Sequence, residues 1–268
     1  MRNFCAIVKY TVFDIVHQKS FFVLLAVSIG FVMLLRGCYS GNYVVNGKAL
    51  DGVTVAWHAS IIAFHVVAGG VLLIASVLSM GLFRRDSDDG TASYMLSKPI
   101  SRAVYAMGRV TGVWAVSFAF MFVLHLAIFI ITLISAGGTM PGYLVASCAC
   151  SINVLFMVLF VSVVSLYVPD FAAAIIGVGV VGISYIADSI YHVAQSKLGQ
   201  AMLANHPIRV PAWETVWPKV GSLQNWAVSF VDSSVFVPLG FIHPAVIMAA
   251  WVCLAAAVLL VAWRYKEL

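Results

Sequence analysis

The sequence predicts an all-α integral membrane protein with six transmembrane helices, and three observations carry that prediction. Only 9% of the 268 residues are charged and 63% are hydrophobic, whereas a soluble domain carries about 25% charged residues. Long charge-free segments recur along the chain, and a helix needs roughly 20 apolar residues to cross a bilayer. No segment alternates in hydrophobicity as the strands of a membrane β-barrel do. The same composition excludes a soluble globule and a disordered chain.

Six apolar segments give the expected spans within a single permease-like domain, residues 1–268. We expect the spans at residues 21–37, 54–83, 110–136, 143–168, 171–188 and 244–264. The Gly- and Pro-rich segment at 135–142 divides the longest charge-free run into two spans, because these residues favour turns. Asp170 and Asp188 flank the fifth span, where we expect both carboxylates to meet water.

Residues 1–20 are expected to form an amphipathic helix on the membrane surface. Apolar side chains fall on one helical stripe: Phe4, Val8, Val12, Ile15 and Val16. Polar side chains fall on the opposite side: Arg2, Asn3, Lys9, Asp14 and His17. Phe13 departs from this pattern, which is otherwise typical of helices lying in the interface plane. The alternative is a simple extension of the first span.

The segment 189–243 interleaves tryptophans with prolines. Tryptophan favours the headgroup level of a membrane, so we expect short interfacial or re-entrant helices here. The segment is too short and too apolar for an independent core. If an extracytoplasmic partner binds the protein, this segment is where we expect it.

The basic residues predict that both termini are cytoplasmic, since cytoplasmic loops carry an excess of Lys and Arg. With the N-terminus inside, the inner segments hold the larger share of them: Arg2, Lys9, Lys19, Arg84, Arg85, Lys98, Arg102, Arg109, Arg264 and Lys266. The outer segments hold Arg36, Lys48, Lys197, Arg209 and Lys219. The net charge of +5 therefore reflects topology and does not indicate nucleic-acid binding.

The inner segment 84–109, between the second and third spans, is the most informative part of the sequence. Asp86, Ser87, Asp88 and Asp89 crowd what we expect to be the start of a short helix, where carboxylates suit the positive helix end. Gly90-Thr91 is an alternative cap, and Lys98-Pro99 ends the helix because the residue before proline avoids the α region. Arg102 and Arg109 are expected to anchor the inner end of the third span.

This segment resembles the signature of the type-2 ABC exporter permeases, the transmembrane subunits of ATP-binding-cassette transporters. That signature has an acidic residue with Gly-Thr, then Leu-Leu-Ser-x-Pro-x-Ser/Thr-Arg, then a Tyr and a Gly-Lys. The corresponding residues here are Asp88 or Asp89, Gly90-Thr91, residues 96–102, Tyr105 and Gly108-Arg109. The acid is Asp where Glu is usual. The nearest subgroup includes the permease of the nitrous-oxide-reductase copper-maturation exporter.

In that family the inner segment is a coupling helix that docks on a separate ATPase subunit. The resemblance therefore implies a homodimer, or paired permeases, bound to two ABC ATPase subunits in the cell inner membrane. It implies docking and coupling by Asp88, Asp89, Gly90 and Thr91, with Pro99 and Arg102 shaping the loop. The alternative is a capped inner loop that has no partner.

No phosphate-binding G-x-x-x-x-G-K-[ST] motif occurs in the sequence. We therefore expect no cofactor and no catalytic residues in this chain, with ATP and Mg²⁺ bound by the partner ATPase. The protein is expected to be a transport subunit and not itself an enzyme.

His65 and His125 are the polar residues of greatest interest inside the spans. Ionisable residues within membrane segments are functional candidates. They can line a transport path, ligate a haem or metal ion, or act as neutral structural side chains.

Three functions follow from these observations. The first is a permease that couples ATP hydrolysis by its partner to substrate export or to lipid transfer from one leaflet. The second is a haem- or metal-binding redox subunit that uses His65 and His125. The third is a membrane anchor that recruits an ATPase without transporting anything.

Overall fold

The computed structural model describes residues 2–39, 44–45, 48–49, 52–136, 140, 142–195, 212–232, 236, 238 and 242–265. Its long helices are α2 (Lys19–Tyr39), α3 (Gly52–Ser79), α6 (Arg102–Ala136), α7 (Gly142–Val164), α8 (Asp170–Gln195) and α12 (Pro244–Tyr265). The shorter helices are α1 (Arg2–Val16), α4 (Leu82–Asp88), α5 (Thr91–Leu96), α10 (Ala212–Val216) and α11 (Val220–Asp232). Two short strands, β1 (Val44–Val45) and β2 (Lys48–Ala49), pair antiparallel.

The apolar helices are those of a multi-pass membrane protein. Within the described residues, five segments are long and apolar enough to cross a bilayer: Thr54–Asp88, Arg102–Ile134, Gly142–Val164, Asp170–Tyr191 and Pro244–Tyr265. Helices α1 and α2 meet the same criteria only when they are taken together, and the chain bends by 68° between them. The predicted helical membrane class is confirmed, while the sixth span and the surface position of α1 stay predictions.

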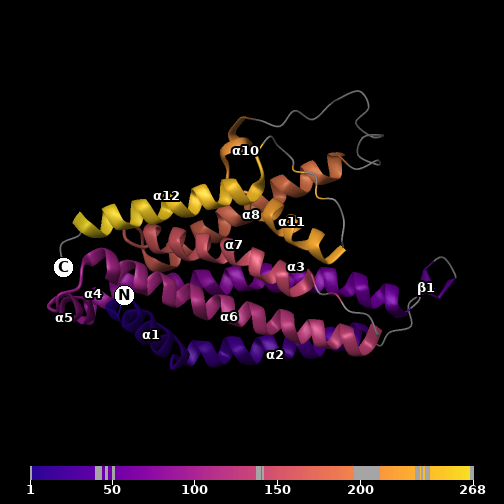
Figure 1. The fold of residues 1–268 in the computed structure, drawn as a ribbon, viewed down its shortest axis with the longest axis horizontal. Coiled ribbons are helices and arrows are strands. Elements are labelled where there is room, and N and C mark those ends of the chain that lie inside the picture. The colour runs from indigo at the N-terminus through magenta and orange to yellow at the C-terminus, as the bar shows by residue number, and fades with distance from the viewer. Residues whose placement is uncertain are drawn as a thin grey trace.

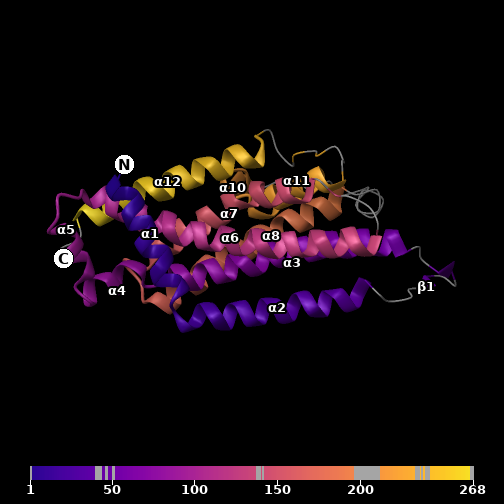
Figure 2. The ribbon, with the colours of Figure 1, turned by 60° about the horizontal axis from the view of Figure 1, so that its bottom comes forward.

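The long helices run side by side along the longest dimension of the molecule (Figure 1). Helices α4 and α5 lie at one end, and β1 lies at the other (Figures 1 and 2). Helix α7 is central, since it contacts α3, α6, α8, α11 and α12. Helix α2 lies along the edge of the bundle opposite α12 (Figure 2).

Helix α1 packs closely against the first half of α6. Ile7, Thr11 and Ile15 form its buried face. A Cβ atom added to Gly108 of α6 would lie 2.8 Å from Ile7 Cγ2, and one added to Gly112 would lie 2.5 Å from Thr11 Cβ. Glycines four residues apart let two helix backbones approach closely.

The buried face of α1 differs from the stripe expected from the sequence. Of that stripe, only Ile15 is buried, and Phe4, Val8, Val12 and Val16 are half-buried. Phe13, which departed from the stripe, is 63% exposed. The face shifts because Gly108 and Gly112 receive the side of the helix that carries Thr11, a polar residue that a hydrophobicity pattern does not select.

We expect Gly112→Leu to loosen α1 from α6, because the new side chain needs the space that Thr11 occupies. Overpacking of this kind costs about 1–3 kcal/mol. Thermal unfolding of the purified protein measures the loss. Gly179→Leu is the matched control, because a Cβ at Gly179 meets nothing within 4 Å. Equal midpoints for the two variants would contradict the close contact.

Helices α6 and α8 extend furthest beyond their predicted spans. Helix α6 begins at Arg102, although the span was expected from residue 110, and α8 continues to Gln195 beyond residue 188. The extension of α6 carries Arg102 and Arg109, which bond to the Arg264 carbonyl and to Asp86. Charge therefore marks the start of α6 poorly.

The two aspartates of α8 have different surroundings. The Asp170 side chain is 36% exposed and lies 3.7 Å from Arg84. Asp188 is 2% exposed, and its carboxylate lies 3.5 Å from Lys219 Nζ. The expectation that Asp188 meets bulk water at the end of the span is therefore wrong, because Lys219 from the 189–243 segment folds back into the bundle to pair with it.

Candidate functional site

The connection from α3 to α6 folds as two short helices that glycines delimit. Gly81 precedes α4 with φ 66°, and Gly90 precedes α5 with φ 69°. This left-handed conformation suits glycine because other residues have a Cβ that clashes there. Asp86 and Asp88 lie at the end of α4, and Asp89 follows it as the C-cap. The expectation that these acids begin a helix is wrong: the turn at Gly90 places them before the second helix.

Asp86 forms the centre of a buried polar network. It is 3% exposed, although it lies in the short helix α4 at the end of the bundle. Arg109 Nε donates a 2.7 Å hydrogen bond to Asp86 Oδ2, and Arg109 Nη2 donates to Asp86 Oδ1. The Tyr105 hydroxyl also donates to Asp86 Oδ2. A paired guanidinium and carboxylate is the strongest charge-assisted arrangement that side chains offer.

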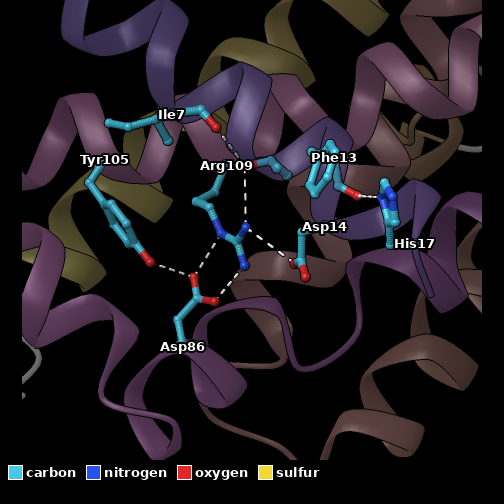
Figure 3. Close-up of polar contacts among 8 residues, drawn as sticks. Ile7, Phe13, Asp14, His17, Asp86, Tyr105 and Arg109 are labelled. Atoms are coloured by element: carbon cyan, nitrogen blue, oxygen red, sulfur yellow. Dashed lines mark hydrogen bonds and ion pairs between the residues drawn. The ribbon is translucent and has the colours of Figure 1, made fainter.

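The same arginine reaches the N-terminal helix. Arg109 Nη1 lies 3.3 Å from Thr11 Oγ1 and 3.6 Å from Asp14 Oδ2. Figure 3 shows the guanidinium between the carboxylates of Asp86 and Asp14. Arg109 itself is only 2% exposed. One side chain of α6 therefore connects α4 and α1, and we call Thr11, Asp14, Asp86, Tyr105 and Arg109 the Arg109 network.

Aromatic side chains support this network from the side of α12. The Trp263 ring lies 4.7 Å from Phe83 of α4 and 6.1 Å from Tyr105 of α6, between ring centroids. Trp263 is 1% exposed. The guanidinium of Arg102 donates to the Arg264 carbonyl at 3.2 Å. The end of α12 is thereby fixed to the α4–α5 connection.

The outward side of α4 and α5 is exposed. Asp88, Asp89, Gly90 and Pro99 are exposed, and Thr91 is half-buried. Tyr94 is 63% exposed, with Lys98 Nζ 4.7 Å from its ring centroid. We call Asp88, Asp89, Gly90, Tyr94, Lys98 and Pro99 the α4–α5 surface. It offers acidic, basic and aromatic groups within one small area.

The structure separates the site residues expected from the sequence into two groups. Asp88, Asp89, Gly90 and Pro99 belong to the α4–α5 surface, with Thr91 beside them. Arg102 is also exposed but bonds to the end of α12. His65 and His125 lie on α3 and α6, each more than ten residues from the helix end that adjoins the α4–α5 connection.

The two histidines are held by protein groups. His125 is fully buried, with Nδ1 2.8 Å from Ser147 Oγ and its ring stacked on Phe64 at 4.5 Å. His65 Nδ1 lies 2.9 Å from Gln224 Nε2 of α11. Both side chains thus join neighbouring helices of the bundle.

Sequence reasoning missed the buried part of the site. It gave Asp88 or Asp89 as the acid of the family signature and did not single out Asp86, which is paired with Arg109. A signal for the network was present: Tyr105 and Arg109 are four residues apart, which places them on one helical face.

The comparisons with known proteins give no family for the chain. No protein-family model matches it, and no curated protein does.

Proposed function

We propose that this chain is the transmembrane permease subunit of an ABC exporter, and that its ATPase docks on the α4–α5 surface. The observation that carries the proposal is the Arg109 network beneath that surface. A docking surface transmits movement to the spans only if its attachment is stiff. Here one buried guanidinium attaches the loop to α6 and α1, and Trp263 attaches it to α12.

The composition of the α4–α5 surface supports docking of a protein partner. Interfaces are enriched in tyrosine, and complementary charges guide association. The exposed acids Asp88 and Asp89 stand beside Tyr94 and Lys98.

The proposal includes the arrangement in the membrane. The end that holds α4 and α5 faces the cytoplasm, together with both termini, in the inner membrane. Two permease copies, expected to be identical, bind two ATPase subunits, and ATP with Mg²⁺ belongs to those subunits. Hydrolysis drives export of a substrate or its transfer out of one lipid leaflet.

The experiment is charge reversal of the exposed acids, Asp88→Lys with Asp89→Lys. We expect the ATPase that co-purifies with the unaltered chain from its native membrane to fall at least tenfold, because charge repulsion replaces attraction at the interface. The thermal midpoint stays unchanged, since both side chains are exposed. Full ATPase recovery and full ATP-driven transport with this variant would contradict the proposal.

Further measurements distinguish the proposed permease from the alternative functions. Tyr94→Ala is expected to weaken ATPase binding, whereas Tyr167→Ala, which changes another exposed tyrosine at 72%, leaves it unchanged. Stoichiometric ATPase binding without a transported species would instead indicate a membrane anchor. A haem absorption band in the purified protein, without an ATPase, would indicate a redox subunit.

A further inference from the structure

Helix α11 occupies only one half of the bundle. At its start, Asn153 Nδ2 donates to the Val220 carbonyl at 3.0 Å, and the Val220 N–H donates to Ser184 Oγ at 3.0 Å. Asn153 lies midway along α7, and Ser184 lies near the middle of α8. At its other end, the Phe230 carbonyl lies against Gly142, the first residue of α7. A Cβ atom added to Gly142 would lie 1.8 Å from the Phe230 carbonyl oxygen. Helix α11 therefore runs from the middle of the bundle toward the end opposite α4 and α5 (Figure 1).

A buried ion pair lies at the mid-bundle start of α11. Asp188 Oδ1 is 3.5 Å from Lys219 Nζ, with side-chain exposures of 2% and 10%. Asp188 Oδ2 accepts a 2.7 Å hydrogen bond from the Ser222 N–H in the first turn of α11. Gly221 allows this approach, because a Cβ there would lie 2.8 Å from Asp188 Oδ2. The pair has no net charge, and the carboxylate already occupies the positive end of the helix.

Near this pair, three buried polar groups have no hydrogen-bond partner among the described residues. They are Asn153 Oδ1, Ser222 Oγ and the Tyr185 hydroxyl. Asn153 and Ser222 are each 3% exposed. Their placement follows from contacts already described: the Asn153 amide bonds to Val220, and Ser222 bonds to Asp188. Tyr185 follows Ser184 on α8 and lies three residues before Asp188, which places it on the same side of the helix as that carboxylate.

Buried polar groups in proteins nearly always have a partner, and ordered water supplies it where protein does not. The groups here include an acceptor, the Asn153 amide oxygen, and two hydroxyls that can donate. A ligand must therefore both accept and donate hydrogen bonds. An anion would face the Asp188 carboxylate and a cation would face the Lys219 ammonium, so a charged ligand has no favourable position.

We propose that Asn153, Tyr185, Asp188, Lys219 and Ser222 form a binding site for a small neutral hydrogen-bonding ligand, with water as the occupant of the resting protein. The site lies at mid-depth in the bundle, at the inner tip of a half-length helix. It is independent of ATPase docking, because none of its residues lies near α4 or α5. Helix α11 thereby brings hydration into the middle of the bundle.

The experiment is radiolytic hydroxyl labelling of the full-length protein in lipid nanodiscs, in which X-rays turn bound water into hydroxyl radicals. The probe is water itself. We expect Tyr185 to be labelled at least fivefold faster than Tyr143, whose hydroxyl donates to the Ser60 carbonyl. We expect Ser222→Ala to reduce the labelling of Tyr185 at least threefold, because it removes one of the groups that hold the water.

Ser222→Ala is not expected to disturb folding, because the Ser222 hydroxyl has no hydrogen-bond partner among the described residues. Ser117→Ala is the matched control, since the Ser117 hydroxyl is also buried without a partner but lies on α6. It should leave Tyr185 labelling unchanged. Labelling of Tyr185 no faster than that of Tyr143, or unaffected by Ser222→Ala, would overturn the proposal, whether or not an ATPase docks on the α4–α5 surface.

Discussion

Arg109→Met is expected to destabilise the protein more than any other single change at the α4–α5 end. The substitution keeps much of the side-chain length but leaves Asp86 buried without its counter-charge. Removing one partner of a buried ion pair costs about 3–5 kcal/mol. Asp86 then keeps the hydrogen bond from the Tyr105 hydroxyl. Thr11 and Asp14 lose their polar contacts with Arg109 of α6. We therefore expect α1 and α4 to loosen together.

The thermal midpoint of the purified protein measures this effect. A loss of that size lowers the midpoint by roughly 6–20 °C for a chain of this length. The matched control is Arg85→Met, because Arg85 immediately precedes Asp86 in the sequence and is exposed. Adding Asp86→Asn to Arg109→Met should recover part of the loss by removing the unpaired charge. Equal midpoints for the Arg85 and Arg109 variants would show that the network contributes nothing.

The second large effect is expected at Lys219→Met. Asp188 then stays buried at mid-bundle with a negative charge and no cation, although it keeps the Ser222 N–H. The expected cost is again about 3–5 kcal/mol. The double variant Lys219→Met with Asp188→Asn should cost less than Lys219→Met alone, since the Asn oxygen still accepts from Ser222 and no charge remains.

A more exposed ion pair provides the comparison with the buried pair of Asp188 and Lys219. Arg84 and Asp170 lie 3.7 Å apart with side chains 41% and 36% exposed. Exposed pairs contribute about 0–1 kcal/mol, so Arg84→Met should change the midpoint little. Thermal midpoints of these variants test the contrast. A double variant as unstable as the sum of its single changes would show that Asp188 and Lys219 do not interact.

The helices were predictable from the sequence because the membrane imposes a simple rule on composition. Apolar runs near the length of a bilayer gave α3, α6, α7, α8 and α12 to within several residues at most ends. The largest error, at the start of α6, falls where charged side chains have partners elsewhere in the fold. Arg109 looks like an interfacial anchor in the sequence, yet it lies inside the protein because Asp86 neutralises it.

The candidate site was predictable only in its exposed part. Asp88, Asp89 and Gly90 stand on the surface, as expected of docking residues. Nothing in a linear pattern distinguishes the buried Asp86 from its exposed neighbours, since the choice depends on which side of α4 faces α6. The burial of Asp188 could not be predicted for the same reason, because its partner Lys219 comes from a later segment of the chain. Which side chains of distant segments pair with each other can be seen only in the folded structure.

The most direct test of the central claim is site-specific photo-crosslinking in the native membrane. A photoreactive amino acid replaces Tyr94 on the α4–α5 surface or, as control, Tyr167, which is exposed outside it. The proposed function predicts that Tyr94 crosslinks to a P-loop ATPase subunit and that Tyr167 does not. Crosslinking to lipid alone from Tyr94, or to an ATPase from Tyr167 but not from Tyr94, would contradict it.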